Sequence, residues 1–132
     1  MIYRLTFLLR LHKTSLNHYI HTEPTKPKIE APKPGRDIPV GDGSPVAMNI
    51  GDNVAAASNT TITIRCPVSG IPTPAITWER DGVLLLDQDK ISFREDSLVI
   101  RGTEVEDSAK YTCRVFNVAG MDKLSSALKI VG

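Results

Sequence analysis

The run Asp107-Ser108-Ala109-Lys110-Tyr111-Thr112-Cys113 decides the fold of this chain, together with Cys66 and Trp78, which lie twelve positions apart. Cys66 and Cys113 are the only two cysteines of the chain. They allow a single pairing, which is one bridge in a secreted protein or two buried thiols in a reducing compartment. A tryptophan between two cysteines, with a tyrosine two residues before the second cysteine, is typical of a β-sandwich.

Length and composition fit one domain with a tail. The chain has 132 residues, of which 41% are hydrophobic, enough for one core. The net charge of +1 gives no general preference for nucleic acid or for an anionic membrane. Residues 1–45 carry seven Lys/Arg and four Asp/Glu, whereas residues 46–132 carry nine and eleven. This division indicates a basic tail on a mildly acidic domain.

The sequence of the first 21 residues matches no clear type of segment. Their longest uninterrupted apolar stretch is residues 5–9, and Arg10 and Lys13 follow it. A secretory signal has an apolar run of about 7–15 residues, and a membrane span needs about 20. We therefore interpret residues 1–21 as an atypical leader or as part of an upstream region, in which case the chain is a fragment.

Residues 22–45 are rich in proline. They hold six of the nine prolines, with Lys26, Lys28 and Lys33 between them. Proline fixes φ and removes a backbone donor, so we expect an extended, solvated linker. A ligand for an SH3-type domain is the alternative interpretation.

Short alternating segments follow from residue 46 to residue 132, and none has the period of a helix. Asp81-Gly82 is a hairpin signal, and residues 70–74 and 117–120 are expected turns. The segments predict an all-β domain. Its expected strands are residues 46–50, 61–66, 75–80, 90–93, 97–100, 110–116 and 124–131.

Residues 50–132 resemble an immunoglobulin domain of the intermediate (I-set) type. The resemblance rests on Cys66-x-x-x-Gly70-x-Pro72-x-Pro74-x-x-x-Trp78-x-x-Asp81-Gly82, Leu98-x-Ile100, Asp107-x-x-x-Tyr111-x-Cys113 and Asn117-x-x-Gly120. It implies a Greek-key sandwich of two antiparallel sheets, joined by a Cys66–Cys113 disulfide, with Trp78 and Leu98 in the core. Residues 71–74 and the proline-rich lead-in are also similar to modules of the ADAMTS-like and papilin group of matrix proteins.

The resemblance also implies structural roles at one corner of the domain. The Tyr111 hydroxyl is expected to donate to a backbone acceptor within residues 102–107. The Asp107 carboxylate is expected to pair with Lys90, or alternatively with Arg94, rather than to act in catalysis or metal binding.

Two positions depart from the family pattern. Ala109 stands where glycine is usual, and Thr103 stands where an apolar core residue is common, with Val105 expected to compensate.

The domain contains no histidine, because His12, His18 and His21 all precede it. Neither a Ser-His nor a Cys-His arrangement can therefore be assembled within the sandwich. The acidic clusters at residues 87–89 and 104–107 lack the spacing of a calcium loop and are interpreted as solvated surface. We expect no enzymatic activity, no cofactor and no metal.

Asn59-Thr60-Thr61 is the only N-glycosylation sequon of the chain. It precedes an expected strand, where a glycan could be attached to an exposed loop. Together with the two cysteines, it favours an extracellular, secreted glycoprotein.

Binding is expected at sheet edges, where unpaired backbone groups can meet a neighbour. The candidate segments are residues 46–50, 83–86 and 115–121. Residues 83–86 are the most suggestive, because four consecutive apolar residues in a strand cannot all face one core. We expect two of them to be buried and the others to be shielded by loops.

These features predict a non-enzymatic module of a secreted matrix or cell-adhesion protein that contacts other proteins, with homophilic contact among the options. Neither nucleic-acid binding nor a membrane span is expected. One alternative is an intracellular I-set domain of a muscle or cytoskeletal scaffold, with reduced cysteines. Another is an accessory domain of a protein related to matrix metalloproteases, with any activity elsewhere.

Overall fold

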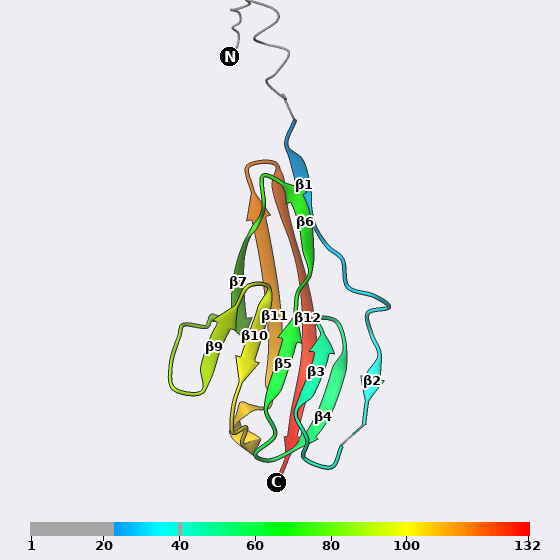
Figure 1. Cartoon of the computed structure of the whole chain (residues 1–132), viewed down its shortest axis with the longest axis vertical. Coiled ribbons are helices and arrows are strands. Elements are labelled where there is room, and N and C mark those ends of the chain that lie inside the picture. The colour runs from blue at the N-terminus through cyan, green and yellow to red at the C-terminus, as the bar shows by residue number, and fades with distance from the viewer. Residues whose placement is uncertain (1–22, 40) are drawn as a thin grey trace, which may run out of the picture.

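The computed structural model describes residues 23–39 and 41–132, which form an all-β sandwich (Figure 1). The expected fold class is thereby confirmed. A six-stranded sheet in the order β2-β4-β12-β11-β7-β8 packs against a four-stranded sheet in the order β3-β5-β10-β9, and β1 pairs with β6. The elements are β1 (Thr25–Ile29), β2 (Asp37–Ile38), β3 (Val46–Asn49), β4 (Asn53–Ala57), β5 (Ile62–Arg65), β6 (Val68–Ile71), β7 (Ala75–Arg80), β8 (Val83–Leu84), β9 (Ile91–Arg94), β10 (Ser97–Ile100), the 3₁₀ helix η1 (Val105–Asp107), β11 (Ala109–Asn117) and β12 (Gly120–Val131).

The core lies between the two large sheets and follows from strand alternation. Successive side chains of a strand point to opposite faces, so every second residue enters the core. In β5 these residues are Ile62 and Ile64, and in β11 they are Tyr111, Cys113 and Val115, all fully buried. Each fully buried large apolar side chain stabilises the fold by roughly 1.5–3 kcal/mol.

The hairpin between β7 and β8 has the predicted turn. Arg80 pairs with Val83, and both intervening residues have positive φ, 49° at Asp81 and 84° at Gly82. Positive φ at both central positions defines a type I′ turn, whose twist matches that of the flanking strands. The turn fixes where the edge strand β8 begins.

Strand β1 lies inside the segment that we expected to be a solvated linker. It pairs antiparallel with β6 and runs beside β12 (Figure 1). Pro27 and Ile29 are buried, and the Ile29 amide donates to the Asp122 carboxylate at 3.0 Å. The expectation of a solvated linker is therefore wrong for residues 25–29. Proline is compatible with this strand because β1 pairs on one side only and its register shifts between Thr25 and Lys28.

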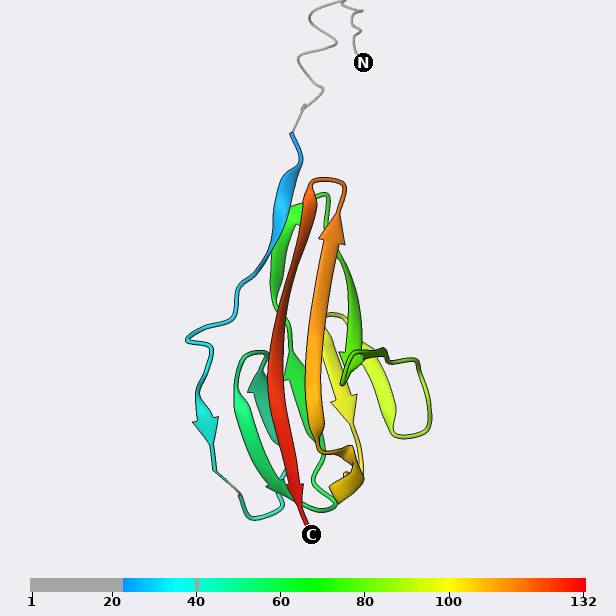
Figure 2. The ribbon, with the colours of Figure 1, turned by 180° about the vertical axis from the view of Figure 1, so that it is seen from behind.

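The chain then supplies one edge strand to each large sheet. Strand β2 pairs parallel with β4, and β3 pairs parallel with β5, on the flank of the sandwich seen from behind in Figure 2. Strand β4 in turn pairs parallel with β12. Parallel pairs thus complete this flank, whereas the remaining strand pairs are antiparallel.

Two buried polar residues are hydrogen-bonded. The Ser126 hydroxyl, which faces the core, accepts from the Gly51 amide at 2.7 Å. Gly51 has φ 101°, and a Cβ there would lie 2.7 Å from Cβ of Pro34, so only glycine fits. Thr103 is fully buried and donates its hydroxyl to the Thr60 carbonyl at 2.7 Å. The expected compensation by Val105 is wrong, because that side chain is half exposed.

Candidate functional site

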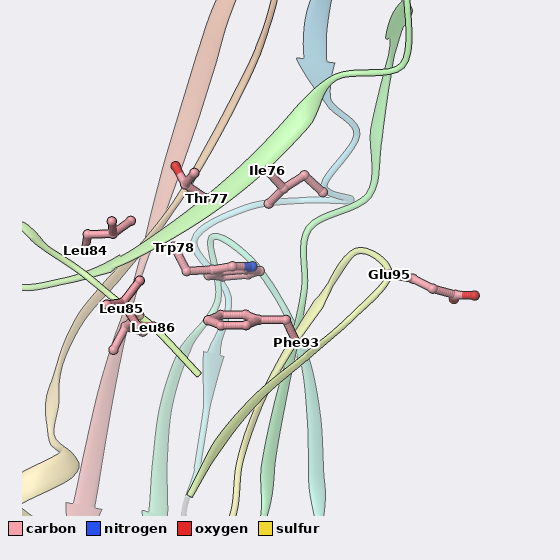
Figure 3. Close-up of a pocket in the computed structure, with 8 residues that line it drawn as sticks. All are labelled: Ile76, Thr77, Trp78, Leu84, Leu85, Leu86, Phe93 and Glu95. Carbon is pink, nitrogen blue, oxygen red and sulfur yellow. The ribbon is translucent and has the colours of Figure 1, made fainter. Parts of the chain in front are cut away.

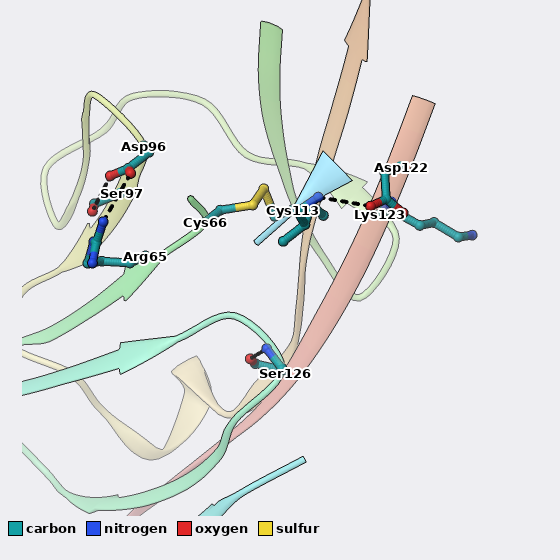
Figure 4. Close-up of a disulfide and its surroundings, with 10 residues drawn as sticks. Arg65, Cys66, Asp96, Ser97, Cys113, Asp122, Lys123 and Ser126 are labelled. Carbon is teal, nitrogen blue, oxygen red and sulfur yellow. Dashed lines mark hydrogen bonds and ion pairs between the residues drawn. A yellow bond between two sulfur atoms is a disulfide. The ribbon is translucent and has the colours of Figure 1, made fainter. Parts of the chain in front are cut away.

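The disulfide joins the two sheets at the centre of the core (Figure 4). Cys66 follows β5 and Cys113 lies in β11, with their Cα atoms 6.5 Å apart and both side chains fully buried. The disulfide that the resemblance implied is confirmed. Trp78 is the cross-strand neighbour of Cys113 in β7, and both Trp78 and Leu98 are buried in the same core cluster.

Tyr111 and Asp107 fasten the corner between η1 and β11. The Tyr111 hydroxyl donates to the Asp107 carbonyl at 2.6 Å. Burial raises the pKa of the Tyr111 phenol to about 12. The Asp107 carboxylate accepts from Lys90 Nζ at 2.6 Å and from the Glu104 amide at 2.8 Å. Its second cation is Arg80, at 3.8 Å, in place of the expected alternative Arg94. Each bond of this carboxylate holds a structural element in position.

Asn59 lies in the turn between β4 and β5. Its side chain is exposed, its φ is 72°, and its amide donates to the Thr103 carbonyl at 2.7 Å. Thr60 is buried and Thr61 is partly exposed. The position is reachable from solvent, and its glycosylation stays a prediction.

The three histidines lie outside the described residues. Within residues 23–39 and 41–132, no group of three or more His, Cys, Asp or Glu side chains is placed to hold a metal ion. Among the same residues, no helix is long and apolar enough to cross a membrane.

Residues 83–86 form an exposed apolar edge of the described sandwich. Val83, Leu84 and Leu86 are 69%, 55% and 66% exposed, and Leu85 alone is buried. The expectation that two of the four are buried and the others shielded is therefore wrong. The reason is that β8 is the last strand of its sheet and pairs with β7 over two residues only.

Beside this edge, a shallow groove of about 220 Å³ opens on the flank where both large sheets end (Figure 3). Strand β8 closes one sheet and β9 closes the other. In Figure 3 the rings of Trp78 and Phe93 lie one above the other, with Leu85 and Leu86 beside them. The groove is lined by Ile76, Thr77, Trp78, Leu84, Leu85, Leu86, Phe93 and Glu95.

The surroundings of the groove are acidic. Residues 81–96 contain five acidic and two basic side chains. Asp96 pairs with Arg65, and Lys90 pairs with Asp107. The remaining side chains are exposed and have a net charge of −3. They are Asp81, Asp87, Asp89, Arg94 and Glu95.

The two other candidate edges differ from this one. In β3, Met48 is buried and packs into the core, so the strand presents little apolar surface. The β11–β12 hairpin exposes three apolar side chains near its tip, Phe116, Val118 and Met121.

The sequence interpretation missed an ion pair that holds the proline-rich connector. The Arg36 guanidinium donates twice to the Asp52 carboxylate, which is fully buried and also accepts from the Asn49 amide at 3.0 Å. Hydrogen bonding to Arg36 holds the pKa of Asp52 below its ordinary value. No local pattern marks the pair, because its members are sixteen positions apart, with β2 and β3 between them.

The Immunoglobulin I-set domain family matches residues 45–130, and the chain belongs to this family. The fold is shared with the solved titin M10–obscurin-like 1 Ig complex. That comparison has a TM-score of 0.61 at 23% identity and covers 80% of this chain and 94% of that one.

The similar proteins are of two kinds. Hemicentin-1 of Mus musculus is 40% identical over 82 residues, covering 59% of this chain, and ADAMTS-like protein 3 of Homo sapiens is 31% identical over 96 residues, covering 73%. The titin homolog of Caenorhabditis elegans is 40% identical over 83 residues, covering 61%. The chain spans 2% of that hemicentin-1, 6% of that ADAMTS-like protein and 0%, to the nearest per cent, of the titin homolog. I-set domains thus occur in both extracellular and muscle proteins.

Proposed function

We propose that the chain is a non-enzymatic protein-interaction module of a secreted extracellular-matrix or cell-adhesion protein. The observation that carries the interaction is the exposed apolar edge at residues 83–86, beside a groove that the buried side chains of Trp78 and Leu85 also line. Contiguous exposed apolar surface is costly unless a partner covers it. Immunoglobulin domains act through protein–protein contacts, and relatives such as hemicentin-1 and ADAMTS-like protein 3 are matrix proteins.

The secreted location is supported by two further features. A Cys66–Cys113 disulfide persists in oxidising compartments, whereas cytosolic thiols are kept reduced. Asn59 stands exposed within its sequon. The similarity to a titin homolog favours a second candidate, an intracellular scaffold domain with two buried thiols in place of the bridge.

The test is the intact mass of the full chain, recovered without reductant from the medium and from the lysate of expressing cells. Secretion predicts a species in the medium that is lighter by two hydrogens than the reduced chain and carries a glycan. Thr61→Val is the matched control, because it removes the hydroxyl that the sequon requires at its third position and leaves Asn59, with its positive φ, in place. The variant should be secreted with the disulfide and without the glycan.

The scaffold candidate predicts a different result. The chain would then be found in the lysate alone, without glycan and with both thiols free. That result would overturn the secreted location. It would leave the interaction surface to be tested separately.

A further inference from the structure

We propose that the groove between β8 and β9 receives an extended protein segment whose apolar residues are flanked by lysine or arginine. This inference rests on the proposed interaction function and adds the site and the chemistry of the partner. Its first support is the geometry of the flank. Strands β8 and β9 each end a sheet. In β9 the Ile91 amide and carbonyl bond with Gln88, and the rest of each outer side has no strand partner among the described residues.

An extended segment fits such a place better than a helix. The free side of an edge strand offers backbone donors and acceptors to a neighbouring strand, and alternate side chains of that neighbour enter pockets. Here the pocket is apolar at its base, where Trp78 and Leu85 are buried, and Leu86 and Phe93 form its exposed walls. A strand with small or branched apolar residues on one face would cover these side chains.

The charge around the groove indicates which residues should flank the apolar residues of the partner. Asp81 stands before the apolar edge, Asp87 and Asp89 stand after it, and Glu95 lines the groove. These carboxylates are exposed, with Arg94 as the cation among them. A segment with lysine or arginine at both ends would meet opposite charge on each side, which gives specificity and faster association.

The same charges disfavour a second copy of this chain as the occupant. If residues 83–86 of two copies paired antiparallel about a two-fold axis, Asp81 of one copy would lie opposite Gln88 of the other, diagonal to Asp87 and Asp89. Like charges brought together in this way repel each other. A basic partner avoids this repulsion at both ends.

The probes are two synthetic peptides with the same core of alternating valine and threonine. One carries two lysines at each end, and the other carries two glutamates. Each is titrated into the isotope-labelled full chain at low salt, and amide chemical shifts are followed. We expect the lysine peptide to bind at least about tenfold more tightly, with the largest shifts at residues 83–86 and Phe93. Binding should weaken as salt is added.

Two variants separate the apolar and the charged contributions. Leu86→Ser removes an exposed apolar wall and should weaken the binding of both peptides. Val118→Ser changes an even more exposed apolar residue, at the tip of the β11–β12 hairpin, and should weaken the binding of neither. Asp87→Lys combined with Asp89→Lys should reverse the preference in favour of the glutamate peptide. Well-dispersed amide spectra establish that each variant is folded.

Several outcomes would overturn the proposal. They are equal binding of the two peptides, no binding, or shifts centred away from the groove. Groove shifts that depend on protein concentration alone would identify a second copy as the occupant. Residues 1–13 of the chain are themselves basic and apolar. If a spectroscopic label placed in that segment reported contact with the groove, the segment itself would be identified as the occupant. None of these outcomes affects the secretion test, so failure of this inference is distinguishable from failure of the proposed function.

Discussion

Arg36 holds the buried carboxylate of Asp52 with two hydrogen bonds, from Nε to Oδ1 at 3.0 Å and from Nη2 to Oδ2 at 2.7 Å. The pair is asymmetric in exposure, because the Asp52 side chain is fully buried while that of Arg36 is half exposed. The Gly35 amide also donates to the Gly51 carbonyl at 2.8 Å. These bonds join the proline-rich connector to the start of β4, so the connector is part of the folded unit here.

Arg36→Ala should lower the free energy of unfolding by clearly more than the loss of an exposed ion pair does, because it leaves the buried Asp52 carboxylate without its cation. Denaturation in urea measures this change. Lys28→Ala is the matched control, since Lys28 and Glu30 form an exposed pair with 3.9 Å between Nζ and Oε1. Exposed pairs contribute less than about 1 kcal/mol. Equal effects of the two substitutions would contradict a special role for the Arg36–Asp52 pair.

Acid should weaken the same contact. The pKa of Asp52 is lowered in the folded state, first by its hydrogen bond with Arg36. Unfolding therefore takes up a proton at low pH, and the stabilisation is present above the ordinary pKa of about 3.9 and lost as the pH falls through the lower folded value. We expect the stability difference between the wild type and Asp52→Asn to shrink as the pH is lowered from about 6 to 2. A constant difference across that range would show that Asp52 is not the titrating group.

Alkali should act through Tyr111. Its folded pKa is raised to about 12, mainly by burial, whereas an unfolded tyrosine ionises near about 10. The folded chain thus keeps a proton that the unfolded chain releases, so stability falls as the pH rises between these two values. We expect Tyr111→Phe to remove this part of the alkaline loss. Near-ultraviolet difference titration against the variant should show the Tyr111 phenolate forming only at about pH 12.

Removing the disulfide should cost about 4 kcal/mol in the chain-entropy model, because its cysteines are 47 positions apart. Cys66→Ala combined with Cys113→Ala tests this without leaving a free thiol. The measurement is the midpoint of urea denaturation against the oxidised wild type. Reduced wild type is the control, and it should unfold near the midpoint of the double variant. A double variant as stable as the oxidised protein would show that the bridge contributes little.

The sequence predicted the central strands because their signals are local. In β5 and β11, strict alternation identifies the inward residues, and Cys66, Trp78 and Cys113 mark where the strands meet the core. The turn at Asp81-Gly82 was also readable, since few residue pairs adopt positive φ twice in succession.

What the sequence did not predict depends on contacts between distant segments. Prolines suggested a solvated stretch at residues 25–29, yet an edge strand paired on one side tolerates Pro27. Arg36 and Asp52 meet because β2 and β3 pair with different sheets. The period of apolar residues in the sequence does not indicate which sheet a strand joins. Likewise, the apolar run at residues 83–86 was recognised, but its exposure follows from the position of β8 at the end of a sheet.

The last prediction concerns β1 and tests whether residues 25–29 are a folded strand or a passive linker. Ile29 is buried against the core cluster, and its amide donates to Asp122. Ile29→Ala should therefore lower the free energy of unfolding by about 2 kcal/mol, at the lower end of the range for buried isoleucine. Val118→Ala, at a residue that is 81% exposed, should change it by less than about 0.5 kcal/mol. If Ile29→Ala were as mild as this control, residues 25–29 would behave as a linker in solution, and the pairing of β1 with β6 would contribute nothing to stability.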